Sequence, residues 1–127
     1  MIRQWSASSS NAWDFYGDQN YDGQVNLSSY GNTRNIAWSS DGSKMFYWTT
    51  ANNSSGNNNR RVKVFTASTD FDVTSTLTYS SQSSVMPSNY GQMQMKPDGT
   101  IMYFTDNSSA KVYQHNLSTA YDLSTPS

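Results

Sequence analysis

The aspartates of this chain are the residues that could act as acids and bases, and they stand at repeated positions. Asp41 and Asp98 each precede a glycine, while Asp72 and Asp122 each precede an apolar residue and then Thr or Ser. Two carboxylates beside a glycosidic bond could hydrolyse it, one as an acid and the other as a base or nucleophile. Because the repeat uses each of these positions for a turn, we expect their oxygens to accept hydrogen bonds from nearby backbone instead.

His115 is the single histidine of the chain, and there is no cysteine. A nucleophilic site built on serine would therefore depend on this one imidazole. The residue ends the alternating segment Lys111-Val-Tyr-Gln-His115, which predicts a histidine on the surface of a strand. The sequence thus predicts a protein that is not an enzyme.

Residues 18–29 have the spacing of a calcium-binding loop and resemble an EF-hand or dockerin-type loop. Oxygen-bearing side chains occupy its first, third, fifth and ninth positions: Asp18, Asn20, Asp22 and Asn26. Such oxygens bind calcium, and the glycine at the sixth position permits a sharp bend. Ser29 stands at the twelfth position, where an EF-hand loop has a bidentate acid, so binding should be weak. Calcium binding and a plain hairpin loop are both interpretations of this segment.

Several aromatic side chains could stack on the apolar face of a sugar ring. The candidates are Trp38, Tyr47, Trp48, Tyr30 and Tyr90. Alternation along a strand places Trp38 on the same side as Ile36, and Trp48 on the same side as Phe46. Packing in the core or between repeats is therefore the alternative interpretation of these residues.

Arg60 and Arg61 follow a low-complexity stretch, Ala51–Asn59, that is rich in Asn and Ser. We expect this stretch to form a long exposed hairpin loop, and exposed loops are where contacts are usually made. The two arginines are therefore candidate ligand or interface residues. They are also the only basic cluster in a chain of net charge −1, which argues against nucleic acid as a partner.

The composition indicates one polar-surfaced domain whose core relies on aromatic side chains. Of the 127 residues, 35% are hydrophobic and only 13% are charged, but 14% are aromatic, which separates the chain from disordered sequences. The absence of cysteine excludes a disulfide framework. The first ten residues show no apolar segment typical of a signal peptide, and no run approaches the roughly 18 apolar residues of a membrane helix. We therefore expect a soluble protein.

One unit occurs twice, as Ile36–Tyr47 and Met93–Phe104. In both copies an alternating apolar run meets Asp-Gly and a second alternating run follows, which predicts a β-hairpin. No segment has a helical period, and further strands are expected at 2–5, 24–30, 61–66, 75–81 and 111–115. We predict an all-β fold in one domain, with a partial repeat and leading strand at 1–30 and full repeats at 31–80 and 81–127.

The two copies continue alike after the hairpin. The pattern is Asp-Gly-[Ser/Thr]-x-Met-[Phe/Tyr], then Val-[Phe/Tyr], then an ending such as Leu117-Ser-Thr-Ala-Tyr-Asp122; Ser68–Asp72 and Asn11–Asp14 match this ending. This pattern resembles a β-propeller-type repeat common in bacteriophage and bacterial surface proteins. The resemblance covers residues 35–125 and implies about two and a half propeller-like antiparallel blades. The closing residues 123–127 are expected to continue into another blade.

An array of two and a half blades would be incomplete on its own. Propellers have roughly four to eight blades, and an open array exposes sheet edges and apolar faces. We expect completion by oligomerisation or docking, with other copies of the chain or a capsid or tail protein as partners. A sandwich of the same strands is the alternative that needs no partner.

The resemblance and the expected assembly together predict a structural and interaction protein of a virion. A bacteriophage capsid-decoration, fibre or tail-associated component fits this description best. The alternative is a lectin-like carbohydrate-binding module that forms an oligomeric propeller with sugar sites between its blades. Calcium is the only cofactor that the sequence suggests, and neither nucleic acid nor a membrane is an expected partner.

Overall fold

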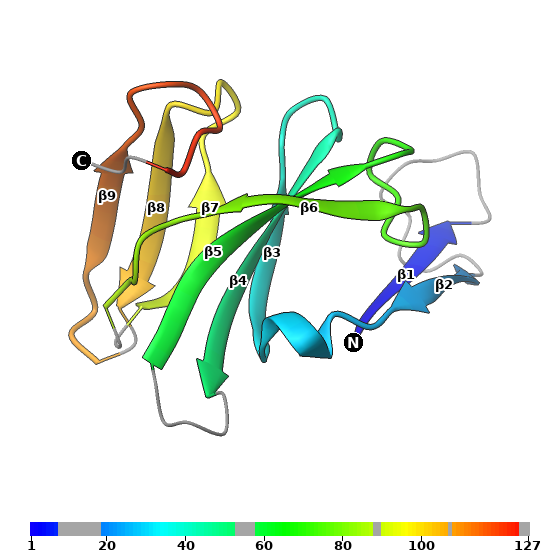
Figure 1. Ribbon diagram of the computed structural model, residues 1–127, viewed down its shortest axis with the longest axis horizontal. Helices are drawn as coiled ribbons and strands as arrows, with labels where there is room; N and C mark the ends of the chain where they lie inside the picture. The colour runs from blue at the N-terminus through cyan, green and yellow to red at the C-terminus, as the bar shows by residue number, and fades with distance from the viewer. Residues whose placement is uncertain (8–18, 53–57, 88–89, 107, 125–127) are drawn as a thin grey trace.

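The computed structural model describes residues 1–7, 19–52, 58–87, 90–106 and 108–124 (Figure 1). Within them the chain forms three antiparallel sheets in which each strand pairs with the next one along the sequence. The first sheet holds β1 (Ile2–Ala7) and β2 (Gln19–Val25). The second holds β3 (Thr33–Trp38), β4 (Lys44–Asn52), β5 (Asn58–Ala67) and β6 (Leu77–Gln82). The third holds β7 (Tyr90–Met95), β8 (Ile101–Asp106) and β9 (Val112–Asn116).

The predicted all-β fold is confirmed for the described residues, whose one helical element is the 3₁₀ turn Ser28–Tyr30. Both predicted hairpins are present, as the pairs β3–β4 and β7–β8. β5 and β9 include the segments 61–66 and 112–115, for which alternation predicts strands. No helix in the described part of the chain is long and apolar enough to span a membrane.

The segment before the 3₁₀ turn differs from its prediction. The sequence predicts a polar loop at 18–23 and a strand at 24–30, but the strand runs over Gln19–Val25. Asn, Asp and Gly are depleted in strands, which is why this segment has the appearance of a loop in the sequence. Pairing with β1 overrides that preference, and an irregularity between Gln4 and Trp5 leaves Asp22 without a partner in the register.

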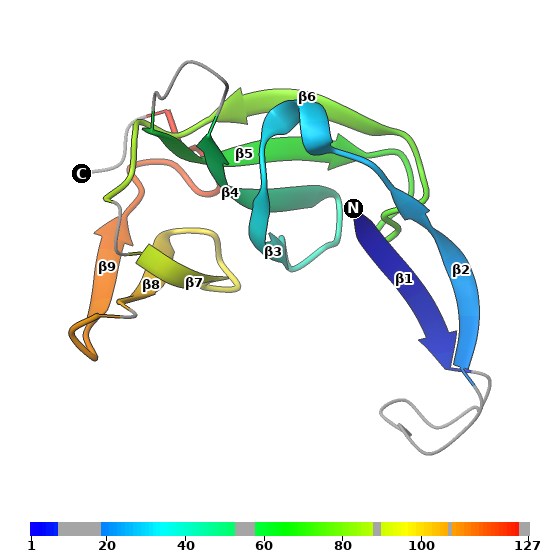
Figure 2. The ribbon, with the colours of Figure 1, turned by 90° about the horizontal axis from the view of Figure 1, so that it is seen from below.

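The middle sheet is covered on both of its faces. Along β4, Met45 and Tyr47 point to one face and Phe46 and Trp48 to the other, and each is at most 1% exposed. Figure 2 shows β1–β2 and β7–β9 on opposite sides of this sheet. A strand buried on both faces must be apolar at consecutive positions, which explains the run Met45–Trp48.

Two separate apolar clusters hold the three sheets together. The cluster toward β7–β9 joins Phe46, Trp48, Val62 and Val64 to residues of the third sheet such as Met93, Met102 and Phe104. The cluster toward β1–β2 joins Met45, Tyr47 and Phe65 to Leu27 and Val73, with Ile2 and Val25 packed against it. The core is therefore two thin layers between stacked sheets rather than one central mass.

The repeated ending of the sequence has a structural explanation at the Asp-Gly turns. Gly42 and Gly99 have φ values of +75° and +72°, a left-handed backbone that glycine adopts without steric cost. The aromatic residue of the ending covers each glycine: Phe71 N donates to Gly42 O at 3.0 Å, and Tyr121 N donates to Gly99 O at 2.8 Å. A methyl group at Gly99 would lie 2.6 Å from the Tyr121 ring. The turn and the ending thus form one unit.

Candidate functional site

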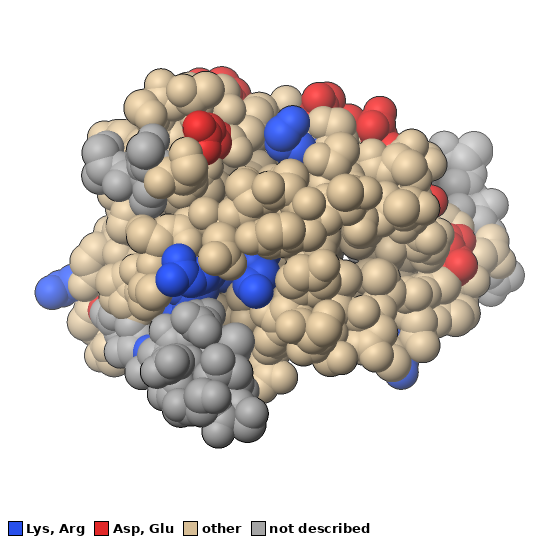
Figure 3. All heavy atoms as spheres, in the orientation of Figure 1, with Lys and Arg blue, Asp and Glu red and all other residues tan. Residues whose placement is uncertain are grey.

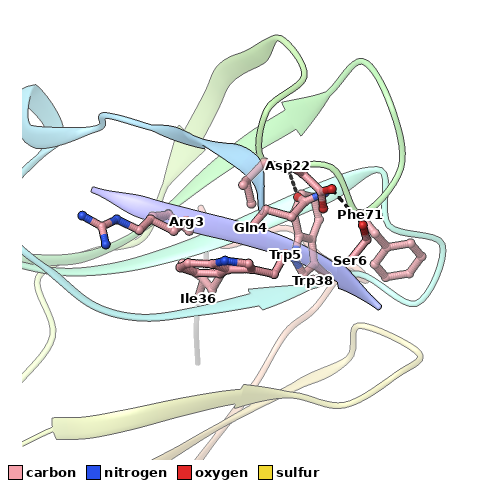
Figure 4. A pocket seen from close by; sticks show the side chains of 10 residues that line it. Arg3, Gln4, Trp5, Ser6, Asp22, Ile36, Trp38 and Phe71 are labelled. Carbon is pink, nitrogen blue, oxygen red and sulfur yellow. Dashed lines mark hydrogen bonds between the residues drawn. The ribbon is translucent and has the colours of Figure 1, made fainter. Parts of the chain in front are cut away.

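A pocket of about 350 Å³ lies between the free edge of β1 and the β3–β4 hairpin (Figure 4). Its lining is Ile2, Arg3, Gln4, Trp5, Ser6, Asp22, Ile36, Trp38, Phe71 and Val73, and we call it the slot. The first sheet has two strands and the second has four, so β1–β2 covers only part of the facing sheet. The slot occupies the part that β1–β2 leaves uncovered.

Three aromatic side chains form the walls of the slot. Trp38 is half-buried, and its ring centroid lies 5.9 Å from that of Phe71 at an angle of 55°. Phe71 is 52% exposed although it is held against Gly42, and Trp5 is 49% exposed. In Figure 4 the Trp5 ring lies near Ile36, and the rings of Trp38 and Phe71 lie further along β1. Open indole and phenyl faces of this kind stack on apolar surfaces of ligands.

The polar side chains of the slot are few and mostly engaged. Gln4 Oε1 accepts the backbone N–H of Val73 at 2.8 Å, which ties β1 to the loop before β6. Ser6 Oγ donates to Asp22 Oδ1 at 2.8 Å, and both residues are exposed. Arg3 adds one positive charge to the single negative charge of Asp22. A slot with aromatic walls, several hydrogen-bonding groups and balanced charges suits a neutral ligand better than a strongly charged one.

Two of the predicted aromatic candidates are wrong as ligand platforms. Trp48 is fully buried and packs edge-on against Phe104 with centroids 5.4 Å apart. Tyr47 is 1% exposed, and its hydroxyl donates to Gly31 O at 2.8 Å. Both belong to the packing between sheets, which is the alternative interpretation of their sequence positions. Trp38 alone among the predicted aromatic candidates lies at an open site.

The remaining aromatic candidates, Tyr30 and Tyr90, are also occupied by packing. Tyr90 is 7% exposed and stacks on Phe104 at 4.7 Å. Tyr30 is half-buried and meets Phe65 edge-on at 4.9 Å. Neither ring has a face open to a ligand in the manner of Trp5 or Phe71.

Arg60 and Arg61 are less exposed than the sequence predicts. Both lie in β5, which begins before the predicted strand at 61–66, and both are half-buried. A guanidinium nitrogen of Arg61 donates to Ser83 O at 2.7 Å, so this side chain fastens the segment after β6 to the middle sheet. The centre of the predicted loop, 53–57, lies outside the described residues.

The predicted calcium loop does not have the shape of a loop. Asn20 and Asp22 lie in the extended strand β2, and Asn26 follows its end. At about 3.3 Å per residue, an extended strand separates residues 20 and 26 by about 20 Å, too far for one ion to contact both. Asp22 accepts the Ser6 hydroxyl, and Asn26 Oδ1 accepts Ser28 N at 3.0 Å. Asp18, the remaining candidate ligand, lies outside the described residues.

The repeated aspartates form turns, as their positions predict. Asp41 Oδ1 accepts Ser43 N, and Asp98 Oδ1 accepts Thr100 N, both at 3.0 Å. The hydrogen bond from Ser39 lowers the pKa of Asp41 to about 2, and that from Lys96 lowers the pKa of Asp98 to about 2. Asp72 and Asp122 each accept a hydrogen bond from the backbone N–H two residues ahead. Each of the four carboxylates is therefore bonded within its own turn, and no two of them form a catalytic pair.

His115 contacts an aromatic residue rather than a nucleophile. Its Nε2 lies 2.8 Å from the hydroxyl of Tyr90, and burial lowers the pKa of the imidazole below its ordinary value. The residue is half-buried on the face of the third sheet that packs toward the middle sheet, not at the surface as the sequence predicts. The described residues contain no group of three or more His, Cys, Asp or Glu side chains that could hold a metal ion.

Sequence reasoning missed four exposed aromatic residues: Trp5, Tyr21, Phe71 and Tyr79. Trp5 and Tyr21 are cross-strand partners whose ring centroids lie 5.4 Å apart. Phe71 could have been found, because it matches Tyr121 in the repeated ending. No local signal in the sequence separates the exposed Trp5 from the buried Trp48.

Comparisons of the chain with protein-family models, with curated proteins and with solved structures gave no match. The features of the structure that indicate a function are therefore the slot and the outer faces of β1–β2 and β7–β9, which no other sheet covers in the described residues.

Proposed function

We propose that the protein is a non-enzymatic structural and interaction protein that acts through assembly, as a capsid-decoration, fibre or tail-associated component of a bacteriophage virion. The virion assignment rests on the repeat pattern, which resembles that of phage and bacterial surface proteins. The assembly assignment rests on the outer two sheets, each of which has one face that no other sheet covers in the described structure. The two are independent, since a protein outside a virion could assemble in the same way.

The three sheets are best interpreted as consecutive blades of a propeller-like array. Three features support this proposal: the four-stranded meander β3–β4–β5–β6, the stacking of sheets on both of its faces, and the contact between β3 and β7. At that contact Asn35 Nδ2 donates to Gln92 Oε1 at 2.7 Å, and these two residues hold equivalent places in the repeat, 57 positions apart. Equivalent residues meet in this way when each blade presents its first strand to a common axis.

The observation that carries the assembly proposal is the difference between the middle sheet and the outer sheets. β4 and β5 are covered on both faces, whereas β1–β2 and β7–β9 each have one face without a neighbouring sheet in the described structure. The exposed apolar side chains on these two sheets are Trp5 at 49%, Tyr21 at 54% and Val112 at 68%. On the face shown in Figure 3, most of the surface belongs to uncharged residues.

The native mass of the purified chain tests this proposal. Sedimentation velocity or light scattering at micromolar concentration should show a discrete oligomer whose population rises with concentration. A folded chain that stays monomeric throughout that range would contradict assembly through its own copies. A search for the chain among the proteins of purified virions, by mass spectrometry of the phage that carries it, tests the virion assignment separately.

Carbohydrate binding is a second candidate function, and the slot favours it. Trp38 and Phe71 offer rings beside a few hydrogen-bonding groups, the combination that recognises a neutral sugar. A glycan array with the wild-type chain and with Trp38→Ala is the direct test. Tyr103→Ala removes a half-exposed aromatic side chain on β8, in a different sheet from every residue of the slot, and serves as the matched control. Binding that survives Trp38→Ala, or falls equally in the control, would refute a sugar site at the slot.

A further inference from the structure

The sheet β1–β2 corresponds to the second half of the middle sheet. Trp5 pairs with Tyr21 as Phe65 pairs with Tyr79, and the register shifts directly before Trp5 in one sheet and directly before Phe65 in the other. β1 is therefore equivalent to β5, and β2 is equivalent to β6. In the middle sheet β5 lies between β4 and β6, whereas β1 pairs with β2 alone in the described residues. The free edge of β1 is thus the edge that β4 occupies in the middle sheet.

The slot at this edge has an equivalent on the other side of the middle sheet, where a side chain of β4 fills it. The repeat aligns three slot residues with residues of the third sheet and its ending: Ile36 with Met93, Trp38 with Met95, and Phe71 with Tyr121. These three counterparts pack in one apolar cluster with Phe46 of β4. The Phe46 ring stacks on the Tyr121 ring with centroids 5.9 Å apart. The slot is therefore lined by residues whose counterparts, one repeat later, receive a side chain of β4.

Burial at the two sites differs as the absence of a β4-type strand beside β1 predicts. Met95 is 5% exposed, whereas its counterpart Trp38 is half-buried. Tyr121 is half-buried, whereas its counterpart Phe71 is 52% exposed. Val73 of the slot is buried already, so the two aromatic rings are the surfaces that an added side chain would cover.

The backbone of β1 offers hydrogen-bonding groups to an added strand. In the middle sheet, Ala67 N donates to Ser43 O at 2.9 Å just before β4 begins, so every second residue of β5 counted from Ala67 bonds to β4. By the equivalence of β1 and β5, Arg3 and Trp5 direct their backbone N–H and C=O groups to the free edge. An extended peptide can add to such an edge as a further strand: the main-chain bonds give affinity, and pockets for alternate side chains give specificity.

We propose that the slot accepts an extended strand of another protein, which pairs with the free edge of β1 and packs an aromatic side chain against Trp38 and Phe71. In the register of β4 on β5, Phe46 lies opposite Val64, whose equivalent in β1 is Gln4. The accepted strand therefore carries its aromatic residue opposite Gln4. This inference goes beyond the proposed function, because it assigns one surface to a partner of stated chemistry.

The geometry favours such a strand over a second copy and over a sugar. Within the described residues, the strands of this type are β4 and β8, which carry Phe46 and Tyr103 at the equivalent position. Each of them already pairs on both edges, so a second copy has neither strand to donate. A sugar would contact the aromatic rings of the slot but would make no use of the row of backbone groups along β1.

Fluorescence anisotropy with a labelled peptide tests the inference. The peptide has the sequence of Lys44–Thr49 from β4, with lysines added at its ends for solubility, and should bind the wild-type chain saturably. A matched peptide that carries Phe46→Ser should bind about tenfold more weakly or worse, the effect of removing a central aromatic side chain from an interface. Both peptides are measured on the unaltered protein, so the folding of a variant does not affect this comparison.

Proline substitution tests whether the peptide pairs with β1. Arg3→Pro removes a backbone N–H at the free edge and should raise the Kd of the β4 peptide by about tenfold or more. Val112→Pro is the matched control: Leu117 N donates to Thr100 O, so alternation directs the N–H of Val112 to the free edge of β9, in a sheet without slot residues. It should leave the Kd within about twofold. Proline is tolerated on edge strands, and urea unfolding of both variants checks that they fold.

The outcomes separate this inference from the proposed function and from sugar binding. No binding of the β4 peptide, or equal binding of its Phe46→Ser form, would overturn the inference, while an oligomeric native mass would still support assembly. Equal effects of Arg3→Pro and Val112→Pro would overturn pairing with β1. A glycan that binds the wild-type chain but not Trp38→Ala, without peptide binding, would assign the slot to sugar instead. A monomeric chain that binds the peptide as expected would contradict self-assembly and support the strand site.

Discussion

Replacing Gly99 by alanine tests whether the Asp-Gly turn and the aromatic residue of the repeated ending form one unit. Two costs should arise. An L-residue at a φ of +72° costs about 1–2 kcal/mol, because its Cβ crowds the backbone in the left-handed region. The added methyl group would also lie 2.6 Å from the Tyr121 ring, so the ring must move.

The second cost follows from what the Tyr121 ring does in its present place. It stacks on Phe46 with centroids 5.9 Å apart, a contact worth about 0.5–1.5 kcal/mol beyond its buried area. Its hydroxyl donates to Pro97 O and accepts Ser40 N–H at 3.3 Å, and losing a bond of this kind costs about 0.5–1.5 kcal/mol. Gly99→Ala should therefore lower the free energy of unfolding by about 2–5 kcal/mol in total.

Urea unfolding of a double-mutant cycle separates the two costs. In a chain that already carries Tyr121→Ala, no ring opposes the methyl group, and Gly99→Ala should cost only the backbone term of about 1–2 kcal/mol. Equal losses in the two backgrounds, within about 0.5 kcal/mol, would refute the contact between turn and ring as the reason for the repeated aromatic residue.

Three further experiments test the packing. Trp48→Ala removes a fully buried ring and should cost about 3–5 kcal/mol in urea unfolding, well above Trp38→Ala at the slot. Tyr121→Phe keeps the ring but removes the hydroxyl bonded to Ser40, and should cost about 0.5–1.5 kcal/mol. Burial lowers the pKa of His115 below its ordinary value of 6.5, so the unfolded chain takes up the proton first. The free energy of unfolding should therefore fall as the pH drops from about 7 to about 5, and His115→Gln should flatten that slope.

Each of these three predictions would be contradicted by a specific result. Equal losses from Trp48→Ala and Trp38→Ala would mean that burial between the sheets does not set their contributions. A neutral Tyr121→Phe would mean that the hydroxyl makes no net contribution across the two turns. An unchanged pH slope in His115→Gln would assign the loss of stability to other groups.

The hairpins can be predicted from the sequence because their determinants are local. Asp-Gly supplies the turn, and alternation on either side of it sets which residues share a face, so the pattern alone groups Phe46 with Trp48 correctly. Which face is covered depends on neighbouring sheets, and those contacts join residues far apart in the chain. Trp5 and Trp48 therefore look alike in sequence although one is 49% exposed and the other fully buried.

The candidate site is less predictable than the fold, for two physical reasons. Residues 19–25 carry Asn, Asp and Gly, which individually favour turns, but pairing with β1 makes the segment a strand and separates the expected calcium ligands. The slot arises because β1–β2 has two strands and the sheet it covers has four. Strand numbers in facing sheets are a property of the assembled fold, and sequence patterns indicate only Trp38 among the aromatic residues of the slot.

The double coverage of the middle sheet sets the order in which parts of the molecule open. Amide protons in β4 and β5 are shielded by side chains on both faces, so they should exchange with deuterium only when the whole chain unfolds. Those in β1, β2 and β9 should exchange through local opening, because each of these strands has an open face or edge. Assembly that covers the open face of one outer sheet should therefore slow exchange in that sheet.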